Sequence, residues 1–389
     1  MVTEHGIARH GAGPGAALRA FTSQIHPVFM LPPLAASAFG AVLAVRVDAL
    51  PFVLHLVAAF AALYTAHVKD GYVDFHLRGE DEDHPMTALG CRTALVGASA
   101  VFFACAIALG VVVGPVATLV TLPGWIVGYL HAPQLDLHPV GATAGYPSGV
   151  SFALLGGYYV QAEAFSPVVL AFAAIFLVTL SGVKTIDDTK DHDYDRSIGK
   201  RTVAVVLGPG RARSFAYALM GVGMFAVLAL AIEGVFPPSA PAAAVAFGIV
   251  AAFAYRAPPR LATMLLVRGA YVFLALLVAA VWFRPLAGAP LPDITVLGPY
   301  TYLATEVMFG SVAALLLWHT RAWWAAARTV AVVYPVAYVW DWYTLEVGVF
   351  AIPMRTGIEL LGIPLEEHLF MLVVPAFVVG VHETLNGDD

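Results

Sequence analysis

Charged residues are scarce in this chain of 389 residues: Asp, Glu, Lys and Arg make up 12% of it, against about 25% in an ordinary soluble domain. So little charge excludes a disordered chain and a nucleic-acid-binding protein. Apolar residues reach 60%, and the mean hydropathy is +0.81. One water-soluble core does not need that much apolar surface, so the composition predicts a protein that crosses the lipid bilayer many times.

The small number of cysteines and the lack of lysine after position 200 exclude further classes of function. The chain has two cysteines, Cys91 and Cys105, both in or beside one apolar stretch, so neither a disulfide framework nor a cysteine metal site is expected. No lysine follows Lys200, which excludes a retinal Schiff base on the final helix. The first 24 residues lack the apolar run of a signal peptide, so we expect the first spanning helix to direct insertion.

Twelve apolar runs approach the length of about 20 residues that a spanning helix needs. The predicted fold class is therefore all-α: a polytopic membrane helical bundle with a nine-helix core and a three-helix C-terminal unit. A Pro- and Gly-rich stretch separates the two. The runs lie near 28–46, 51–68, 93–113, 115–131, 149–165, 167–184, 214–233, 239–255, 268–284, 299–318, 328–346 and 365–385. The predicted domains are a cytoplasmic N-terminal tail (1–24), the core (25–285), a linker (286–297) and the C-terminal unit (298–389).

The positive charges predict the orientation. With twelve spans and the N-terminus inside, every Lys and Arg except Arg46, Arg284 and Arg355 falls on the cytoplasmic side. Cytoplasmic loops carry an excess of Lys and Arg, and losing one early span would destroy this partition. We therefore expect a multi-pass protein of the cytoplasmic membrane with both termini inside.

Two acidic segments face that same side. Residues 69–84 read KDGYVDFHLRGEDEDH, and residues 184–202 read KTIDDTKDHDYDRSIGKRT. Asp187, Asp191 and Asp195 recur every four residues, which would stack their carboxylates on one face if the membrane helix continues. Asp70 and Asp74 have the same spacing. The alternative is that both segments are simply solvated loops, but the repeated spacing and the shared side argue against it.

Carboxylates at several points around a cavity suit Mg²⁺, which usually keeps waters and bridges to phosphate oxygens. Two such clusters can hold a diphosphate between them through the metal, and nearby cations add positive charge on the leaving group. The metal candidates are Asp70, Asp74, Asp81, Asp187, Asp191 and Asp195, and the diphosphate-binding candidates are Lys69, Lys190, Arg196, Lys200 and Arg201.

These segments resemble the two Asp-rich motifs of the UbiA superfamily of intramembrane prenyltransferases. In the second segment the match covers Asp187, Asp191, Asp195 and the residues Gly199, Lys200 and Thr202 of a G-K-x-T pattern. The first segment departs from the usual N-D-x-x-D, because Asp70 takes the Asn position and Gly71 replaces the first Asp. Asp74 and Asp81 then fill the later acidic positions, with Asp83 as the alternative to Asp81.

The resemblance implies a nine-helix fold and Mg²⁺-dependent transfer of an allylic prenyl group from its diphosphate to a lipophilic acceptor. Asp70, Asp74, Asp187, Asp191 and Lys200 would carry the catalysis. The stretch GGYYVQAE at 156–163 is similar to the quinone-type branch, so Tyr158, Tyr159 and Phe152 become candidates for a cavity that shields the carbocation. Ordinary helix packing is the alternative for these aromatic residues.

The last hundred residues carry different chemistry. Glu306, Asp341, Glu366 and Glu367 lie in or beside apolar spans, where ionisable residues are expensive and functional candidates by default. A buried carboxylic acid can remain protonated and donate its proton to an alkene. Placement of Glu366 and Glu367 at a helix N-terminus, where acids are favoured, is the alternative.

This region resembles the lycopene cyclase domain of the heterodimeric carotenoid cyclases, through Trp340-Asp341, Gly348 and the tetrad Pro364-Leu365-Glu366-Glu367. The resemblance implies that Asp341, Glu366 and Glu367 start ring closure of a polyene. Cyclases of this type combine two three-helix units and this chain has one, so a second cyclase subunit, a homodimer or a merely structural role are the options.

Together, the two halves predict a prenyltransferase that adds a five-carbon unit to lycopene, with its end group then open to cyclisation. Prenylation of an aromatic quinone precursor such as a dihydroxynaphthoate is the second hypothesis. A carotenoid-binding or transport protein, with no need for metal, is the third. All three need the bilayer and a lipophilic ligand, and none needs nucleic acid.

Overall fold

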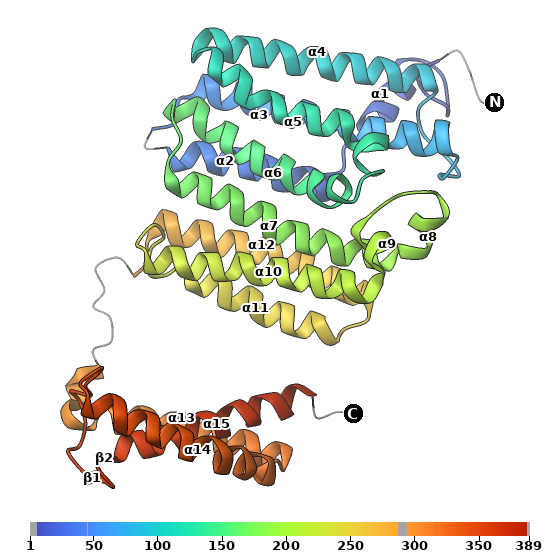
Figure 1. Ribbon diagram of the computed structural model, residues 1–389. Helices are drawn as coiled ribbons and strands as arrows, with labels where there is room; N and C mark the ends of the chain where they lie inside the picture. Colours follow the sequence, from blue (N-terminus) through green and yellow to red (C-terminus); the bar gives the residue numbers. More distant parts are fainter. Residues whose placement is uncertain (1–5, 45, 287–293, 387–389) are drawn as a thin grey trace. The chain divides into compact units, whose positions relative to one another are not determined.

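The computed structural model describes residues 6–44, 46–286 and 294–386 (Figure 1). The chain divides into two compact units, Met1–Ala287 and Gly288–Asp389. The predicted linker 286–297 falls largely on residues 287–293, and the predicted tail begins with residues 1–5. Both of those stretches lie outside the described residues.

The described part of the first unit is built from helices, with one isolated β-bridge between Ala8 and Met86. In chain order they are α1 (Pro14–Thr22), α2 (Pro27–Leu43), α3 (Ala49–Gly71), the π-helical turn η1 (Tyr72–Arg78), α4 (Ala88–Val112), α5 (Pro115–Leu130), η2 (His131–Leu135), α6 (Pro139–Ala162), α7 (Pro167–Lys190), α8 (His192–Ser197), α9 (Val203–Leu207), α10 (Pro209–Ile232), α11 (Pro241–Arg256) and α12 (Pro259–Phe283). The sequence sets many of these starts, because proline is pre-organised for the first helical position. Most of the long helices begin at such a proline, and a hydroxyl side chain caps α4, α7 and α9.

The second unit holds three long helices and one hairpin: η3 (Ile294–Tyr300), α13 (Thr301–Thr320), α14 (Trp323–Glu346), β1 (Glu359–Leu360), β2 (Ile363–Pro364) and α15 (Leu365–Asn386). The two short strands are antiparallel. Leu361 and Gly362 form the turn between them and both have positive φ, 51° and 83°, as a tight two-residue hairpin requires. The hairpin packs its second strand directly against the start of α15, and the sequence did not predict it.

Each of the twelve predicted runs overlaps one helix. Among the described residues, seven helices are long and apolar enough to cross a membrane, or eight if the bent pair α1 and α2 counts as one span. Helices α5 and α11 are shorter, and α6 and α14 are less apolar. The chain is therefore a multi-pass helical membrane protein, as predicted. The stricter test supports seven or eight of the twelve spans.

Close packing between α2 and α6 holds the centre of the first unit. A Cβ added to Gly157 of α6 would lie 2.1 Å from the carbonyl oxygen of Ser37, and one added to Gly40 of α2 would lie 2.1 Å from that of Leu154. The two helices touch backbone to backbone at these glycines. Small residues at helix contacts permit this approach inside membranes, where no hydrophobic effect drives helices together.

Replacing Gly157 with Ala is therefore expected to lower the stability of the detergent-solubilised protein by about 1–3 kcal/mol, because the new methyl group must push the helices apart. The thermal unfolding midpoint measures this. Gly149 lies in the same helix with nothing within 4 Å of an added Cβ, so Gly149→Ala is the matched control and should not lower the midpoint. Equal losses in both variants would contradict this account.

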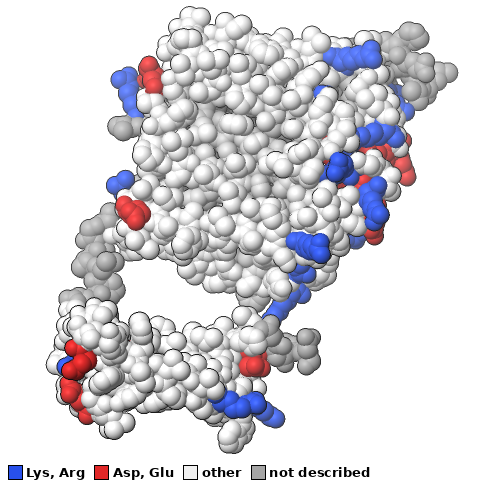
Figure 2. Space-filling view, viewed as in Figure 1, with Lys and Arg blue, Asp and Glu red and all other residues white. Residues whose placement is uncertain are grey.

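Charge is confined mainly to one end of the first unit. Figure 2 shows largely uncharged flanks, with Lys, Arg, Asp and Glu gathered at the end where α8 and α9 lie in Figure 1. Both acidic segments belong to this charged end.

Candidate active site

The first acidic segment is helical over its first half. Asp70 lies in the last turn of α3 and Asp74 in η1. The helix ends at Gly79, whose φ of 67° is left-handed, a conformation that glycine adopts without cost. The amide of Glu80 then donates to the carbonyl oxygen of Asp74 at 2.8 Å. This reversal brings Glu80 back beside Asp74.

The second acidic segment begins inside α7, whose last turn contains Asp187. The helix breaks at Asp191, which has φ −105° and ψ 10°, and the short helix α8 then carries Asp195. The three carboxylates therefore do not stack on one continuous helix, which corrects the expectation from their spacing. Like charges four residues apart destabilise a helix, and the break leaves Asp191 exposed while Asp195 is buried.

Two cations tie the first segment to other parts of the chain. Nη1 of Arg78 lies 3.4 Å from Asp74, 3.5 Å from Glu80 and 2.9 Å from Asp136. Nζ of Lys200 lies 3.4 Å from Oε2 of Glu80. Asp136 stands in the connection before α6, so these ion pairs tie three separate parts of the chain together. The two acidic segments meet at one end of the bundle.

A second set of ion pairs lies at the end of α7. The amino group of Lys184 pairs with Asp188 and lies 3.6 Å from a carboxylate oxygen of Asp187, which Lys190 contacts as well. Asp188 is only 3% exposed. The amino groups of Lys184 and Lys190 therefore both lie beside the carboxylate of Asp187.

The donor set fits a hard divalent cation such as Mg²⁺, which prefers carboxylate oxygens. Among the described residues of this site, two buried carboxylate oxygens have neither a hydrogen-bond nor an ion-pair partner: Oδ1 of Asp136 and Oδ2 of Asp188. A buried carboxylate oxygen without a partner is costly, and a bound cation removes that cost. The residues present therefore suit the metal that the acidic motifs predict.

The charges at the site perturb one another. Burial raises the pKa of Asp195 above its usual range, with Lys200 acting in the opposite direction. Burial also lowers the pKa of Lys200, but the carboxylates of Asp74 and Glu80 outweigh that effect and raise it overall. Lys200 therefore stays charged at any physiological pH, among more carboxylates than it can neutralise by itself.

The other predicted residues lie at varied distances from this cluster. Asp81 is exposed, and Asp83 pairs with Arg9 and His10 at 3.0 and 2.8 Å, which directs it away from the second segment. Arg196 and Arg201 are exposed. Lys69 donates to the carbonyl of Tyr129 at 2.5 Å and lies over that ring, so its amino group is engaged outside the cluster.

Five residues of this cluster were absent from the sequence-based candidates: Arg78, Glu80, Asp136, Lys184 and Asp188. Glu80 and Asp188 carried a weak signal, since each sits inside an acidic run. Asp136 carried none, because it stands alone between histidines and apolar residues. Its place in the site follows from the fold.

The three predicted cavity aromatics do not share one environment. Tyr158 packs against the large core of α2, α6, α7 and α10–α12, whereas Tyr159 packs with Leu109 and Ala117 and its ring lies 5.2 Å from that of Phe165. Phe152 is half-buried. Because consecutive residues of a helix point in different directions, these aromatics divide between two sides of α6.

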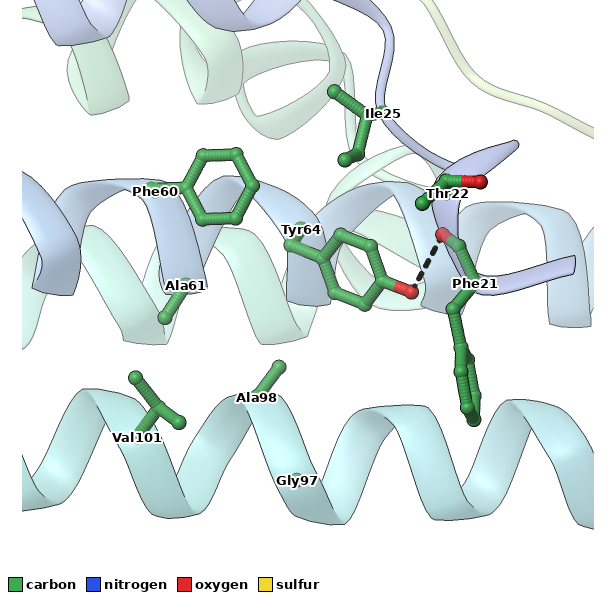
Figure 3. Close-up of a pocket in the computed structure, with 9 residues that line it drawn as sticks. All are labelled: Phe21, Thr22, Ile25, Phe60, Ala61, Tyr64, Gly97, Ala98 and Val101. Carbon is green, nitrogen blue, oxygen red and sulfur yellow. Dashed lines mark hydrogen bonds between the residues drawn. The ribbon is translucent and has the colours of Figure 1, made fainter. Parts of the chain in front are cut away.

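A pocket of about 270 Å³ opens between α1, α3 and α4 (Figure 3). Phe21, Phe60 and Tyr64 contribute its aromatic walls, and the Tyr64 hydroxyl donates to the carbonyl of Phe21 at 2.9 Å. None of the predicted cavity residues lines this pocket. Its lining is almost entirely apolar, which suits a hydrocarbon chain better than a polar ligand.

In the second unit the acids divide into two groups. Glu367, 4% exposed, interacts with the side chains of Asp341 and Tyr302 and with the charge of Glu306. These residues come from α13, α14 and α15, so the three helices converge on one buried acidic cluster. Two carboxyl groups in contact share a proton rather than both ionise, which gives the pair an acid that can donate.

Glu366 faces a different partner. One of its carboxylate oxygens accepts hydrogen bonds from the amide and the hydroxyl of Thr356, each at 2.6 Å. Glu366 and Glu367 both occupy the first turn of α15, as the alternative interpretation expected, yet both are buried. The next residue, His368, is buried as well and lies 2.6 Å from the hydroxyl of Tyr334.

The fold and the site define a class of protein: a helical membrane protein with a carboxylate-rich end. Residues 30–277 match the UbiA prenyltransferase family, and the chain belongs to that family. Residues 299–385 match the lycopene cyclase family. The protein is thus a UbiA-family membrane prenyltransferase that carries a lycopene cyclase domain.

Solved structures share the fold at low sequence identity. One described as digeranylgeranylglyceryl phosphate synthase in membranes has a TM-score of 0.57 and 13% identity, over 69% of this chain and 99% of that chain. The apo UbiA homologue from Aeropyrum pernix K1 has a TM-score of 0.52 and 18% identity over 65% and 97%. The Archaeoglobus fulgidus UbiA homologue bound to DMAPP and Mg²⁺ has a TM-score of 0.50 and 17% identity over 68% and 99%. A comparison with curated proteins gave no match.

Proposed function

We propose that this protein transfers a five-carbon allylic group from dimethylallyl diphosphate to lycopene, using Mg²⁺ held by the two acidic segments. The observation that carries the proposal is the meeting of both segments around Arg78, Glu80 and Lys200. An Archaeoglobus fulgidus homologue of the same fold binds DMAPP and Mg²⁺, which supports this choice of donor. The fused cyclase domain supports a carotenoid acceptor.

The carboxylates of the site would hold the metal, and its cations would stabilise the leaving diphosphate. Asp70, Asp74, Asp187, Asp191 and Asp195 would hold the metal, and we add Glu80 and Asp188 to this set. When bound, Mg²⁺ supplies positive charge to the leaving diphosphate. Lys200 and Arg78 are positioned beside the same carboxylates and stabilise the diphosphate further as its negative charge develops.

The reaction is a substitution at the allylic carbon of the diphosphate. The bond between the allylic carbon and the diphosphate oxygen breaks, and the oxygen keeps the electron pair. A terminal double bond of the polyene attacks the allylic carbon, forming a carbon–carbon bond. The new cation then loses a proton or takes up water. The apolar helices of the first unit would keep competing water away from the allylic cation.

The test uses the purified full-length protein with Mg²⁺, dimethylallyl diphosphate and lycopene in detergent or nanodiscs. We expect carotenoids heavier by one or two units of C5H8 where a proton is lost, or of C5H10O where water is taken up, by mass spectrometry. We also expect no product after chelation, and recovery when Mg²⁺ is restored. A parallel reaction offers a dihydroxynaphthoate and a long-chain prenyl diphosphate. Product in that reaction alone would replace the carotenoid assignment with the quinone one, and unmodified lycopene throughout would reject it.

We further propose that the second unit cyclises the end group. Glu367 and Asp341 would share the donated proton, while Glu366 holds the loop at Thr356 in place. A single three-helix unit would work with a second copy of the chain or with another cyclase subunit. With both termini on the cytoplasmic side of the cell membrane, the charged end of the first unit would meet soluble diphosphates.

Glu367→Gln is expected to abolish formation of ring end groups while leaving prenyl transfer intact, because the amide has no carboxylic proton to donate. Product analysis in carotenoid-producing cells separates the two activities. The control is Glu359→Gln in β1, whose exposed carboxylate pairs with Arg355 on the surface and should not affect either activity. Normal ring formation in the Glu367 variant would contradict the assigned role.

A further inference from the structure

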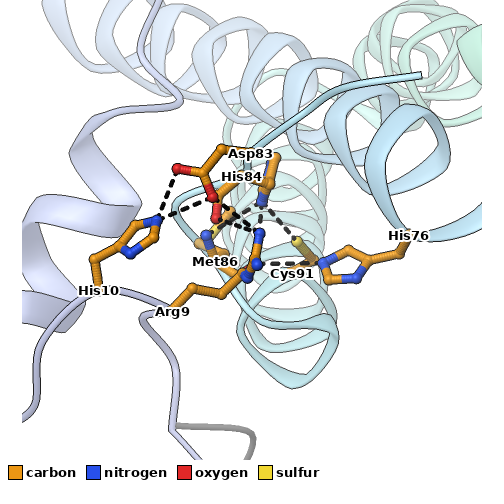
Figure 4. Close-up of polar contacts among 7 residues, drawn as sticks. All are labelled: Arg9, His10, His76, Asp83, His84, Met86 and Cys91. Carbon is orange, nitrogen blue, oxygen red and sulfur yellow. Dashed lines mark hydrogen bonds and ion pairs between the residues drawn. The ribbon is translucent and has the colours of Figure 1, made fainter. Parts of the chain in front are cut away.

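A second group of metal-ligating side chains brings two histidines of the first acidic segment, His76 and His84, together with Cys91 of α4 (Figure 4). One ligand atom of each lies within 4.8 Å of one from each of the others. His76 comes from η1, His84 from the loop that follows, and Cys91 from the first turn of α4. The three residues are near one another in the sequence, but they form a cluster only because the chain turns back from η1 toward α4.

The spacing of the donors is close to that of a tetrahedral metal site. With Zn–N near 2.0 Å and Zn–S near 2.3 Å, tetrahedral ligand atoms lie about 3.3–3.6 Å apart. Sγ of Cys91 lies 3.9 Å from Nδ1 of His84. The carbonyl oxygen of Met86 lies 3.1 Å from that nitrogen and 3.2 Å from Nε2 of His76. The three donor atoms lie within 4.8 Å of one another, so closing distances by up to about 1.5 Å would bring them around one ion. The fourth position is left to this carbonyl or to water.

Two of the three donors are enclosed. Cys91 is fully buried and His84 is 4% exposed, whereas His76 is half-buried. Nδ1 of His84 is the nitrogen near Cys91, and its Nε2, on the other side of the ring, has no hydrogen-bond partner among the described residues. That imidazole packs against the backbone of Gly71, where an added Cβ would lie 2.7 Å from Nε2. Gly71, the residue that replaces an Asp of the family motif, therefore provides the space that His84 occupies.

The N-terminal segment closes the cluster from outside. Residues 7–9 pair with residues 85–87: the amide of Arg9 donates to Pro85 at 2.9 Å, and that of Thr87 donates to Ile7 at 3.0 Å. Arg9 also stacks on Phe75 with its guanidinium 4.3 Å from the ring centre. This segment covers His84 and Cys91, which are buried, while His76 stays half-buried.

We propose that His76, His84 and Cys91 form a structural zinc site that fastens the end of the first acidic segment to α4. A thiolate with two imidazoles selects a borderline-soft ion such as Zn²⁺, whereas the all-oxygen cluster of the active site selects Mg²⁺. The sequence suggested no cysteine metal site, because the three donor residues of this site belong to different structural elements. This inference does not depend on which acceptor the enzyme prenylates.

The test is a titration of metal-free, full-length protein in detergent with Co²⁺, a spectroscopic substitute for Zn²⁺. We expect one equivalent to produce a thiolate-to-cobalt charge-transfer band in the near ultraviolet, which Zn²⁺ abolishes and excess Mg²⁺ does not. The band reports cysteine alone, so cobalt bound to the Asp clusters does not contribute. Absence of the band in the wild-type protein would overturn the proposal, whatever the variants do.

The chain supplies a matched pair of variants. Cys91→Ala should lose the band, and Cys105→Ala, the other cysteine and in the same helix, should keep it. Alanine is well tolerated at position 91, because the side chain packs among small apolar residues such as Ala8, Ala94 and Val68. A band that survives in Cys91→Ala would overturn the site, and His84→Gln provides an independent second loss.

Discussion

Changing Asp187 to Asn should lower kcat/KM for prenyl transfer by about 10²–10³-fold, the usual effect of removing one pre-organised charge from a transition state. The carboxylate lies at the end of α7 beside buried Asp188, and Lys184 and Lys190 hold it in place. Asn keeps the shape but removes the negative charge that a divalent ion needs. Steady-state rates at several Mg²⁺ concentrations measure the loss, and we expect the Mg²⁺ requirement to rise.

Asp193→Asn is the control for this experiment. Asp193 belongs to the same acidic segment, but its side chain is fully exposed and contacts His192. If general acidity of the segment were what mattered, the two variants would lose activity alike. A near-normal rate for the Asp187 variant would remove this residue from the metal site.

Changing Lys200 to Met should lower both the stability of the protein and the rate of prenyl transfer. Lys200 is the cation that joins the second acidic segment to Glu80 of the first. Its loss leaves the Glu80 carboxylate, 7% exposed, with less compensation, at a cost of about 1–3 kcal/mol. It also removes positive charge from the diphosphate, so we expect kcat/KM to fall by about 10²-fold.

A double variant separates the two effects. Combining Lys200→Met with Glu80→Gln removes both charges, so the unfolding midpoint should recover while prenyl transfer stays low. Arg211→Gln, at an exposed position in the first turn of α10, is the surface control and should change neither quantity. Recovery of activity together with stability would show that Lys200 acts only through the fold.

Much of the fold was predictable from local sequence. Apolar runs predicted the positions of twelve helices, and prolines coincide with the starts of α5, α6, α7 and α10. Both acidic segments were recognised from their Asp spacing. What local sequence could not predict was the break of the second segment at Asp191 or the separation of Tyr158 from Tyr159, because each depends on the neighbours that the helix meets.

The same holds in the second unit. The sequence drew attention to Glu366 and Glu367 as a pair, but adjacent residues on a helix face different directions, and each found its own partner: Thr356 for one, Asp341 for the other. His368 gave no clear signal, although it is buried against the ring of Tyr334. The four-residue motif therefore identified the region, but it did not predict that the two glutamates make different contacts.

By itself, the sequence determined that the chain lies in a membrane, where its helices fall and which segments carry acid, because run length, proline position and charge spacing act over one or two helical turns. The tertiary structure alone decided which charges share a site. Arg78 pairs with Asp136 across 58 residues of chain, and Lys200 with Glu80 across 120. Such pairs form because packing of the helices brings distant loops to one end of the bundle, where buried charges must find opposite ones.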